Sequence, residues 1–137
     1  MSLFDAFRIA GGGAVAQGQR LNVVASNLAN ADSAAGPDGQ AYRARQVVFE
    51  AVDLGGTANG AQSVRVRSVT TDSSPPRRVH DPKHPLADGE GYVSMPNVSA
   101  AEEMVNMISA ARSYESNIEV MNTAKTLLQK TLQLGSN

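Results

Sequence analysis

The segment that decides the fold is SAAEEMVNMISAARSYESNIEVMNTAKTLLQKTLQL, which runs from Ser99 to Leu134. It is the longest stretch of the chain without glycine or proline, and we expect it to form one long helix. Ser99 precedes Glu102 at the spacing by which an N-cap hydroxyl and an N3 carboxylate satisfy each other's backbone donors. Gly135 suits the left-handed residue that follows a last helical turn. Both ends of the segment therefore agree with its interior.

Two series of residues at seven-residue spacing predict the contact faces of this helix. The first series consists of Met104, Ala111, Ile118, Lys125 and Leu132. The second consists of Met107, Tyr114, Met121 and Leu128. We assign both series, with Ile108, to an assembly interface, in which Lys125 is the one break in the apolar pattern. A further stripe predicts another neighbour for the C-terminal half, and its members are Val120, Leu127 and Leu134.

The composition fits one modest domain with little material for a compact core. Of the 137 residues, 42% are apolar but only 4% are aromatic, so large core-filling side chains are scarce. The net charge of −1 provides no basic field for nucleic acid or anionic lipid. The absence of cysteine excludes disulfides, zinc–thiolate sites and thiol nucleophiles. No apolar run approaches the roughly 18 residues of a membrane span.

A second amphipathic helix is expected between Leu3 and Ala31, where apolar residues again recur every seven positions. Glycines weaken this helix, because each costs about 1 kcal/mol relative to alanine in a helix interior. These glycines are Gly11, Gly12, Gly13 and Gly18. The pattern is stronger from Ala14 to Ala29, and this is the span that we expect to be helical. Its residues in the predicted assembly interface are Leu21, Val24 and Leu28.

Between the helices the chain is polar and rich in glycine and proline. Residues 42–52 and 64–67 have the β-branched or alternating patterns of strands, and residues 92–95 are expected to form a third, short strand. Residues 54–62 predict a flexible loop. Residues 73–86 carry four prolines and predict an extended linker. This middle segment has too few large apolar residues to form a core of its own.

The motifs that suggest chemistry are weak. A glycine-rich match to the dinucleotide fingerprint at 11–16 is followed by turn residues where a second strand should lie. His80 and His84 have the spacing of zinc ligands on a helix, but Pro82 between them prevents that helix. No nucleophile elbow, zinc-protease helix or phosphate-binding loop is present. We therefore expect no enzyme activity, catalytic residue, metal or cofactor.

Several motifs resemble the flagellar rod and hook axial proteins. Residues 20–31, RLNVVASNLANA, resemble the signature of these proteins, and residues 42–49, YRARQVVF, resemble its usual sequel. The core of the signature consists of Ser26, Asn27, Leu28, Ala29 and Asn30. The segments 80–85, 91–98 and 103–110 narrow the resemblance to the basal-body rod protein family, and within it to the proximal rod subunits. The match covers nearly the whole chain in order.

This resemblance implies a structural subunit of the bacterial flagellar basal body. Such a subunit would be made in the cytoplasm and exported through the flagellar type III apparatus without a cleaved signal. It would polymerise into the periplasm-spanning proximal rod, which transmits motor torque. Its partners would be other rod subunits, itself in a helical tube, and basal-body and export-apparatus proteins, with no nucleic acid and no small-molecule substrate. The alternative from another class is a non-flagellar coiled-coil adaptor or export chaperone.

The expected fold is mainly α. Long N- and C-terminal helices form an antiparallel coiled-coil-like pair, with a small irregular or β insert between them. The expected regions are an N-terminal helical arm at 1–31, an extended or β-rich insert at 32–98, and a long C-terminal helix at 99–137. Because neither helix can bury its apolar stripes alone, we expect both termini to build one assembly domain.

Overall fold

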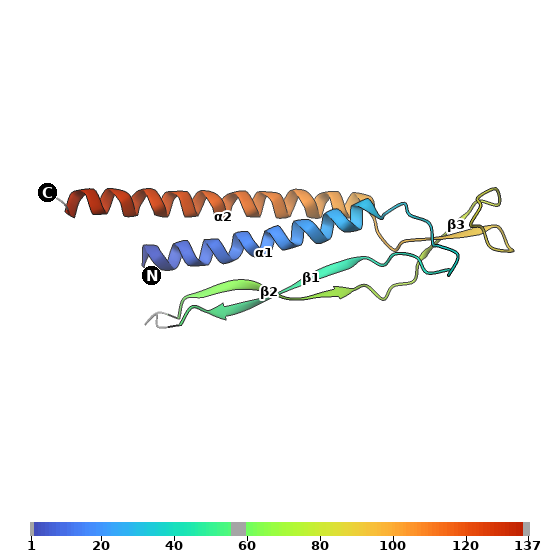
Figure 1. Cartoon of the computed structure of the whole chain (residues 1–137), viewed down its shortest axis with the longest axis horizontal. Helices are drawn as coiled ribbons and strands as arrows, with labels where there is room; N and C mark the ends of the chain where they lie inside the picture. The colour runs from blue at the N-terminus through green and yellow to red at the C-terminus, as the bar shows by residue number, and fades with distance from the viewer. Residues whose placement is uncertain (1, 56–59, 136–137) are drawn as a thin grey trace.

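The chain is an elongated pair of antiparallel helices, with one β-hairpin beside them and a second beyond their end (Figure 1). The computed structural model describes residues 2–55 and 60–135. Its elements are α1 (Leu3–Ala29), β1 (Arg45–Asp53), β2 (Gln62–Thr71), β3 (Arg77–His80), β4 (Tyr92–Met95) and α2 (Ala100–Gly135). The expected fold class is confirmed. Of the loop predicted at 54–62, residues 56–59 lie outside the described residues.

Helix α1 begins with a capping box at Ser2 and Asp5. The Ser2 hydroxyl accepts a hydrogen bond from the Asp5 backbone N–H at 3.1 Å, and the Asp5 carboxylate accepts one from the Ser2 N–H at 2.9 Å. This box satisfies two backbone donors that a helix start otherwise leaves unpaired. The helix expected between Leu3 and Ala31 is confirmed, and it includes the glycine-rich turns before the stronger span from Ala14 to Ala29. Capping and packing together outweigh the cost of the glycines.

The Asp5 carboxyl makes the start of α1 sensitive to acid. The hydrogen bond from the Ser2 backbone N–H holds the pKa of Asp5 below its ordinary value of 3.8. Because the folded-state pKa is lowered, the stabilisation is present above 3.8 and is lost as the pH falls through the folded value. We expect the Asp5 carboxyl to titrate with a midpoint below 3.8. The chemical shift of the Asp5 backbone amide, measured by NMR as a function of pH, reports this titration. A midpoint at or above 3.8 would contradict this cap.

Small residues line the contact between the two helices. Ala10 and Ala14 on α1 and Ala110 and Ala124 on α2 are all buried. Gly13 continues this surface, since a Cβ built there would lie 2.7 Å from the Asn117 Oδ1 atom and 2.9 Å from its Nδ2 atom. The backbones can therefore approach closely at the point where the sequence indicated the weakest helix.

The two predicted series each lie only partly in buried positions, since Tyr114 of the second series is exposed and Ala111 and Ile118 of the first are half-buried. Met107 and Met121, from the second series, are half-buried. The positions expected for the first series are taken by residues one place earlier, Ala110, Asn117 and Ala124. Alanine and asparagine carry little apolar surface, so the sequence pattern favoured their larger neighbours. The first-series residues Met104, Lys125 and Leu132 are exposed in the single chain.

Substitution by alanine is expected to have opposite effects on stability at Gly13 and at Gly11, two positions away in α1. Gly13→Ala should lower the free energy of unfolding by about 1–3 kcal/mol, because the new methyl group displaces the Asn117 amide. That amide donates a hydrogen bond to the Ser113 carbonyl at 2.8 Å, which the displacement breaks. Gly11→Ala is the matched control, since its Cβ would lie 3.9 Å from Met121. It should raise the free energy of unfolding by up to about 1 kcal/mol. Urea unfolding measures the free energy of unfolding of both variants. Equal changes would contradict the close contact between Gly13 and Asn117.

The first hairpin lies along α1. Strands β1 and β2 pair antiparallel, with a bulge between Val48 and Phe49. The predicted strands at 42–52 and 64–67 are found, but β1 starts later and β2 extends further in both directions. The Arg8 guanidinium donates to the Leu54 carbonyl at 3.0 Å and holds the end of the hairpin on α1. Gly12 faces this hairpin, because a Cβ there would overlap the Ser63 hydroxyl.

The second hairpin forms the far tip of the molecule (Figure 1). Strand β4 lies at the predicted position, and it pairs antiparallel with β3. Strand β3 lies within residues 73–86, for which the sequence predicted only an extended linker. Its prolines flank it and leave its backbone free to pair. The Asp88 carboxylate accepts hydrogen bonds from the Tyr92 N–H at 2.9 Å and the Arg78 guanidinium at 2.6 Å. Polar contacts thus fix a tip that has little core.

Helix α2 has a defined start and an unsupported end. At the start, the Ser99 hydroxyl accepts a hydrogen bond from the Glu102 backbone N–H at 3.4 Å. At the end, Gly135 is the last helical residue and does not have a positive φ. The prediction that Gly135 is a left-handed terminating residue is therefore wrong. The last turn of α2 extends past the start of α1 (Figure 1).

Candidate assembly interface

Asn27 joins three segments of the chain at one buried point. Its side chain is 1% exposed. The Oδ1 atom accepts hydrogen bonds from the Tyr42 hydroxyl and the Arg45 backbone N–H, both at 2.9 Å. The Nδ2 atom donates to the Arg45 carbonyl at 2.8 Å and to the Glu103 carboxylate at 3.0 Å. The amide therefore uses its full hydrogen-bonding capacity and fixes the end of α1 relative to β1 and α2.

The neighbouring motif residues complete this junction. The Ser26 hydroxyl accepts a hydrogen bond from the Arg45 guanidinium at 2.7 Å, and that guanidinium lies over the ring of Tyr42. Asn30 donates from its side chain to the Ser26 carbonyl at 2.8 Å, which satisfies an acceptor in the last turn of α1. Leu28 is half-buried and Ala29 is exposed. The signature residues 26–30 thus form the end of α1 and also make the hydrogen bonds that attach this end to the segment before β1.

Asn97 is a second polar junction, to which sequence reasoning assigned no role. Its Oδ1 atom accepts a hydrogen bond from the Ala44 N–H at 2.7 Å, and its Nδ2 atom donates to the Ser74 carbonyl at 3.0 Å. It lies beside a small apolar cluster formed by Ala31, Ala44 and Val98. These contacts join the segments before β1, after β2 and before α2. Only the proximity of Asn97 to a predicted helix start could have indicated such a role.

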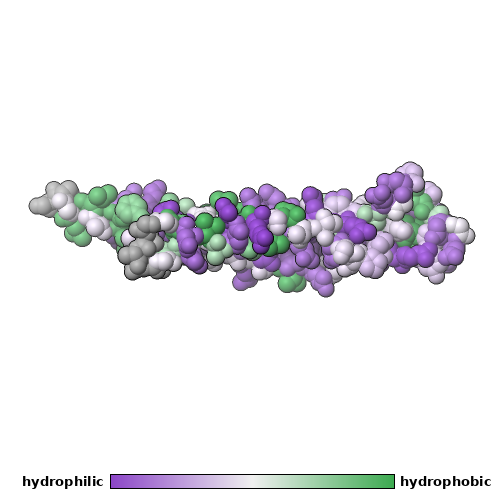
Figure 2. Space-filling model, turned by 90° about the horizontal axis from the view of Figure 1, so that it is seen from below, coloured by the Kyte–Doolittle hydropathy of each residue, from purple (hydrophilic) through white to green (hydrophobic). Residues whose placement is uncertain are grey.

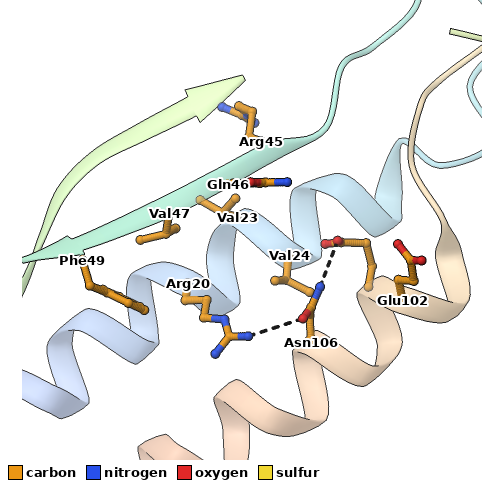
Figure 3. Close-up of a pocket in the computed structure, with 10 residues that line it drawn as sticks. Arg20, Val23, Val24, Arg45, Gln46, Val47, Phe49, Glu102 and Asn106 are labelled. Atoms are coloured by element: carbon orange, nitrogen blue, oxygen red, sulfur yellow. Dashed lines mark hydrogen bonds between the residues drawn. The ribbon is translucent and has the colours of Figure 1, made fainter. Parts of the chain in front are cut away.

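A cleft of about 520 Å³ opens between α1, β1 and the first turns of α2 (Figure 3). In it the Arg20 guanidinium donates to the Asn106 side-chain oxygen at 3.4 Å, and the Asn106 amide donates to Glu103 at 3.3 Å. Glu102 lines the same cleft. The apolar part of the lining comes from two elements and consists of Val23, Val24, Val47 and Phe49. The cleft therefore combines an apolar wall with two carboxylates and with the guanidinium groups of Arg20 and Arg45.

Much of the apolar surface faces outward. On the first turns of α2, Met104, Val105 and Ile108 are 54%, 66% and 58% exposed. The stripe predicted to need another neighbour is also exposed, at 48% for Val120, 45% for Leu127 and 80% for Leu134. Apolar surface gathers at the end of the molecule where α2 terminates (Figure 2). Exposed apolar side chains that gather on one element are typical of protein-binding surfaces.

The residues that we assigned to assembly divide into two groups in the single chain. The buried or half-buried group consists of Leu21, Val24, Leu28, Met107, Ala111, Ile118, Met121 and Leu128. The exposed group consists of Met104, Ile108, Tyr114, Lys125 and Leu132. Contacts within the chain cover the residues of the first group, at least in part. The residues of the second group remain exposed and are available for contact with a neighbouring subunit.

Within residues 2–55 and 60–135, no three His, Cys, Asp or Glu side chains gather in a way that could hold a metal ion. None of the helices in the same ranges is long and apolar enough to cross a membrane.

Comparison with known proteins places both helices in one family. Residues 7–37 match the family described as "Flagella basal body rod protein", and residues 90–134 match "Flagellar basal body rod FlgEFG protein C-terminal". A flagellar basal-body rod protein FlgC from Yersinia enterocolitica is 57% identical over 98% of this chain and 99% of the relative. The chain belongs to the FlgC family of flagellar basal-body rod proteins. It is therefore a structural subunit of the basal-body rod.

Other FlgC proteins support the same assignment. The FlgC protein of Salmonella typhimurium is 56% identical over 98% of this chain and 99% of the relative, and that of Borreliella burgdorferi is 36% identical over 98% of each. The matched residues 7–37 include most of α1 and Asn27, and residues 90–134 include β4 and nearly all of α2. Membership of this family does not favour the alternative of a coiled-coil adaptor or export chaperone.

Proposed function

We propose that this FlgC-family chain polymerises through the outward faces of its two terminal helices into the proximal part of the rod. The observation that carries the proposal is the exposed apolar surface of α2, which the chain itself does not cover. Burying this surface against neighbours would stabilise the assembly by roughly 25 cal/mol for each Å² of apolar area removed from water. The exposed assembly residues named above are the proposed contacts, and both termini act as one assembly domain.

Stiffness follows from the same arrangement. A subunit whose long helices share their burial with neighbours cannot bend without exposing apolar surface. We propose that the rod transmits motor torque through these shared helix contacts. The partners are copies of this chain, other rod subunits, and basal-body and export-apparatus proteins. We propose no catalytic role and no nucleic-acid or small-molecule ligand.

The route to the rod is also part of the proposal. The chain is made in the cytoplasm and exported through the flagellar apparatus without cleavage, to a rod that spans the periplasm. Support comes from α1, whose capping box begins at Ser2 and whose buried Asp5 and Ala10 belong to the packed structure. Cleavage after this region would remove part of the helix pair.

A gene deletion with complementation tests the proposed function. Cells without the chain should be non-motile, and electron microscopy of their basal bodies should show rods that stop at the base. The wild-type chain supplied in trans should restore both the rod and swimming. Complete rods in the deletion strain would exclude a role as an obligatory proximal rod subunit.

A further inference from the structure

Each hairpin is a sheet of only two strands, so every strand has an outer edge that pairs with no other strand. Such an edge presents backbone N–H and C=O groups to which another extended segment can bind. The chain covers parts of these edges itself. Ala35 donates its N–H to the Ser94 carbonyl of β4 at 2.8 Å. Helix α1 approaches β2 so closely that a Cβ on Gly12 would lie 3.1 Å from the Val64 carbonyl oxygen. The outer edge of β1 borders the cleft that Figure 3 shows.

Hydrogen bonds at both ends of β1 identify the backbone groups that point away from β2. The Ala44 carbonyl accepts from the Asp72 N–H at 2.8 Å, and the Leu54 N–H donates to the Ala61 carbonyl at 3.1 Å. In an antiparallel pair, residues bonded to the partner strand alternate with residues whose N–H and C=O point outward. Even-numbered residues of β1 therefore pair with β2, and odd-numbered residues face the outer edge. The bulge does not change this alternation, because its extra residue, Arg67, lies on β2.

Asn27 already pairs with this outer edge. Its amide donates to the Arg45 carbonyl and accepts from the Arg45 N–H, as the backbone of a neighbouring strand would. The next outward groups belong to Val47, Phe49 and Ala51. Within residues 2–55 and 60–135, no side chain and no backbone group outside the hairpin makes a hydrogen bond to the backbone of these three residues. The edge therefore continues past Asn27 with donors and acceptors that the described part of the chain does not use.

The cleft provides an apolar wall beside this edge. The apolar residues of its lining are Val23, Val24, Val47 and Phe49. The two arginines of the lining balance its two glutamates, so the backbone edge, and not a net charge, is the basis for recognition. The cleft also adjoins the exposed face of α2, since Glu102 and Asn106 line both the cleft and a second hollow beside Val105. A neighbour that covers this face in the rod can therefore reach the edge of β1.

We propose that an extended segment of a different rod subunit adds to the outer edge of β1 as a third strand. Its backbone pairs with Val47 and Phe49, and one of its apolar side chains packs on the valines of the cleft. The inference rests on the proposed function and specifies how a neighbour is held. The occupant is an extended segment because the outward groups recur at every second residue, which is the repeat of a β-strand. Within the described residues the strands of this chain are already paired in its hairpins, so a second copy has no unpaired strand to contribute.

Proline substitutions separate the outer edge of β1 from the fold of the hairpin. Val47 and Val69 face each other in the β1–β2 register, and the N–H of each points away from the other strand. Proline removes an N–H and is tolerated in edge strands where that N–H faces outward. We expect Val47→Pro to reduce incorporation into isolated basal bodies at least about tenfold, because the ring also occupies the space of the incoming strand. Val69→Pro, the matched control on the opposite edge, should incorporate at nearly the wild-type level. Val47→Ala keeps the N–H and should lose much less than Val47→Pro.

A photoreactive probe identifies the occupant. The natural chain has no cysteine, so a Gln46→Cys variant can be labelled with benzophenone at one position of the cleft lining. In isolated basal bodies we expect this probe to cross-link to an extended segment of another rod subunit, identified by mass spectrometry of the joined peptides. The same label on Arg67→Cys, at an exposed position of β2, should not cross-link to that segment.

The outcomes separate the contact from the function. Incorporation of Val47→Pro at the level of Val69→Pro and of the wild-type chain would overturn the added strand and leave the rod assignment intact. A cross-link from position 46 to a helix of the neighbour or to a second copy, or no cross-link at all, would also overturn it. If both proline variants fail to incorporate, the cross-link decides. Absence of even the wild-type chain from basal bodies would instead defeat the proposed function.

Discussion

An Asn27→Leu variant is expected to lose most of its folding stability. Leucine fits the volume but removes the four hydrogen bonds that Asn27 makes to the Arg45 N–H and carbonyl, the Tyr42 hydroxyl and the Glu103 carboxylate. Each unsatisfied buried group costs about 1–3 kcal/mol, so we expect a loss on the order of 3–6 kcal/mol. Small domains are typically stable by only about 5–15 kcal/mol. Circular dichroism during thermal and urea unfolding measures the loss.

The matched control is Asn22→Leu. Asn22 lies on the same helix but is exposed, and such surface substitutions usually change stability by about 0.5 kcal/mol or less. Asn27→Asp provides a second comparison, because it keeps the size but places a carboxylate against Glu103. It should also destabilise the chain. An Asn27→Leu midpoint equal to that of the control would show that the junction does not hold the segments together.

An Ile108→Asp variant is expected to abolish swimming while the protein still folds. Ile108 is 58% exposed in the single chain, so the substitution disturbs little within it. In an assembled rod the same position would bury a carboxylate in an apolar contact, and an unpaired buried charge is very costly. We expect normal amounts of folded protein in the cell and no spreading in soft agar.

Asn122→Asp is the control for added charge. It places one carboxylate on an exposed position of the same helix and should leave swimming nearly unchanged. Circular dichroism of both purified variants shows whether either is misfolded. Wild-type swimming of the Ile108→Asp strain would show that this face of α2 is not part of the assembly interface.

The sequence predicted the helix pair well because periodicity and capping are local signals. Helix α2 and the end of α1 lie where their patterns place them, and strand β4 lies at the predicted residues 92–95. The first turns of α1 had the weaker helical pattern, because in the sequence alone glycine counts only by its cost in a helix. The structure shows that Gly12 and Gly13 are covered on two sides, by Ser63 and by Asn117. Such compensation depends on residues distant in sequence.

The site was less predictable for the same reason. The sequence identified Asn27 through its motif, but its partners Tyr42, Arg45 and Glu103 come from different segments, the last 76 positions away. The choice between Ala110 and Ala111, or between Asn117 and Ile118, depends on how closely the helices approach. Apolar size alone does not distinguish the members of each pair. The assignment of Ala111 and Ile118 to an assembly interface stays a prediction.

Quantitative fractionation of cells tests the central claim most directly. Detergent-extracted basal bodies from cells that make the wild-type chain should contain most of the folded, exported protein as a fixed component of the rod. The Ile108→Asp chain should be absent from the same fraction and present in the soluble one. A wild-type chain that stays in the soluble fraction as a small, persistent oligomer would contradict assembly through the terminal helices.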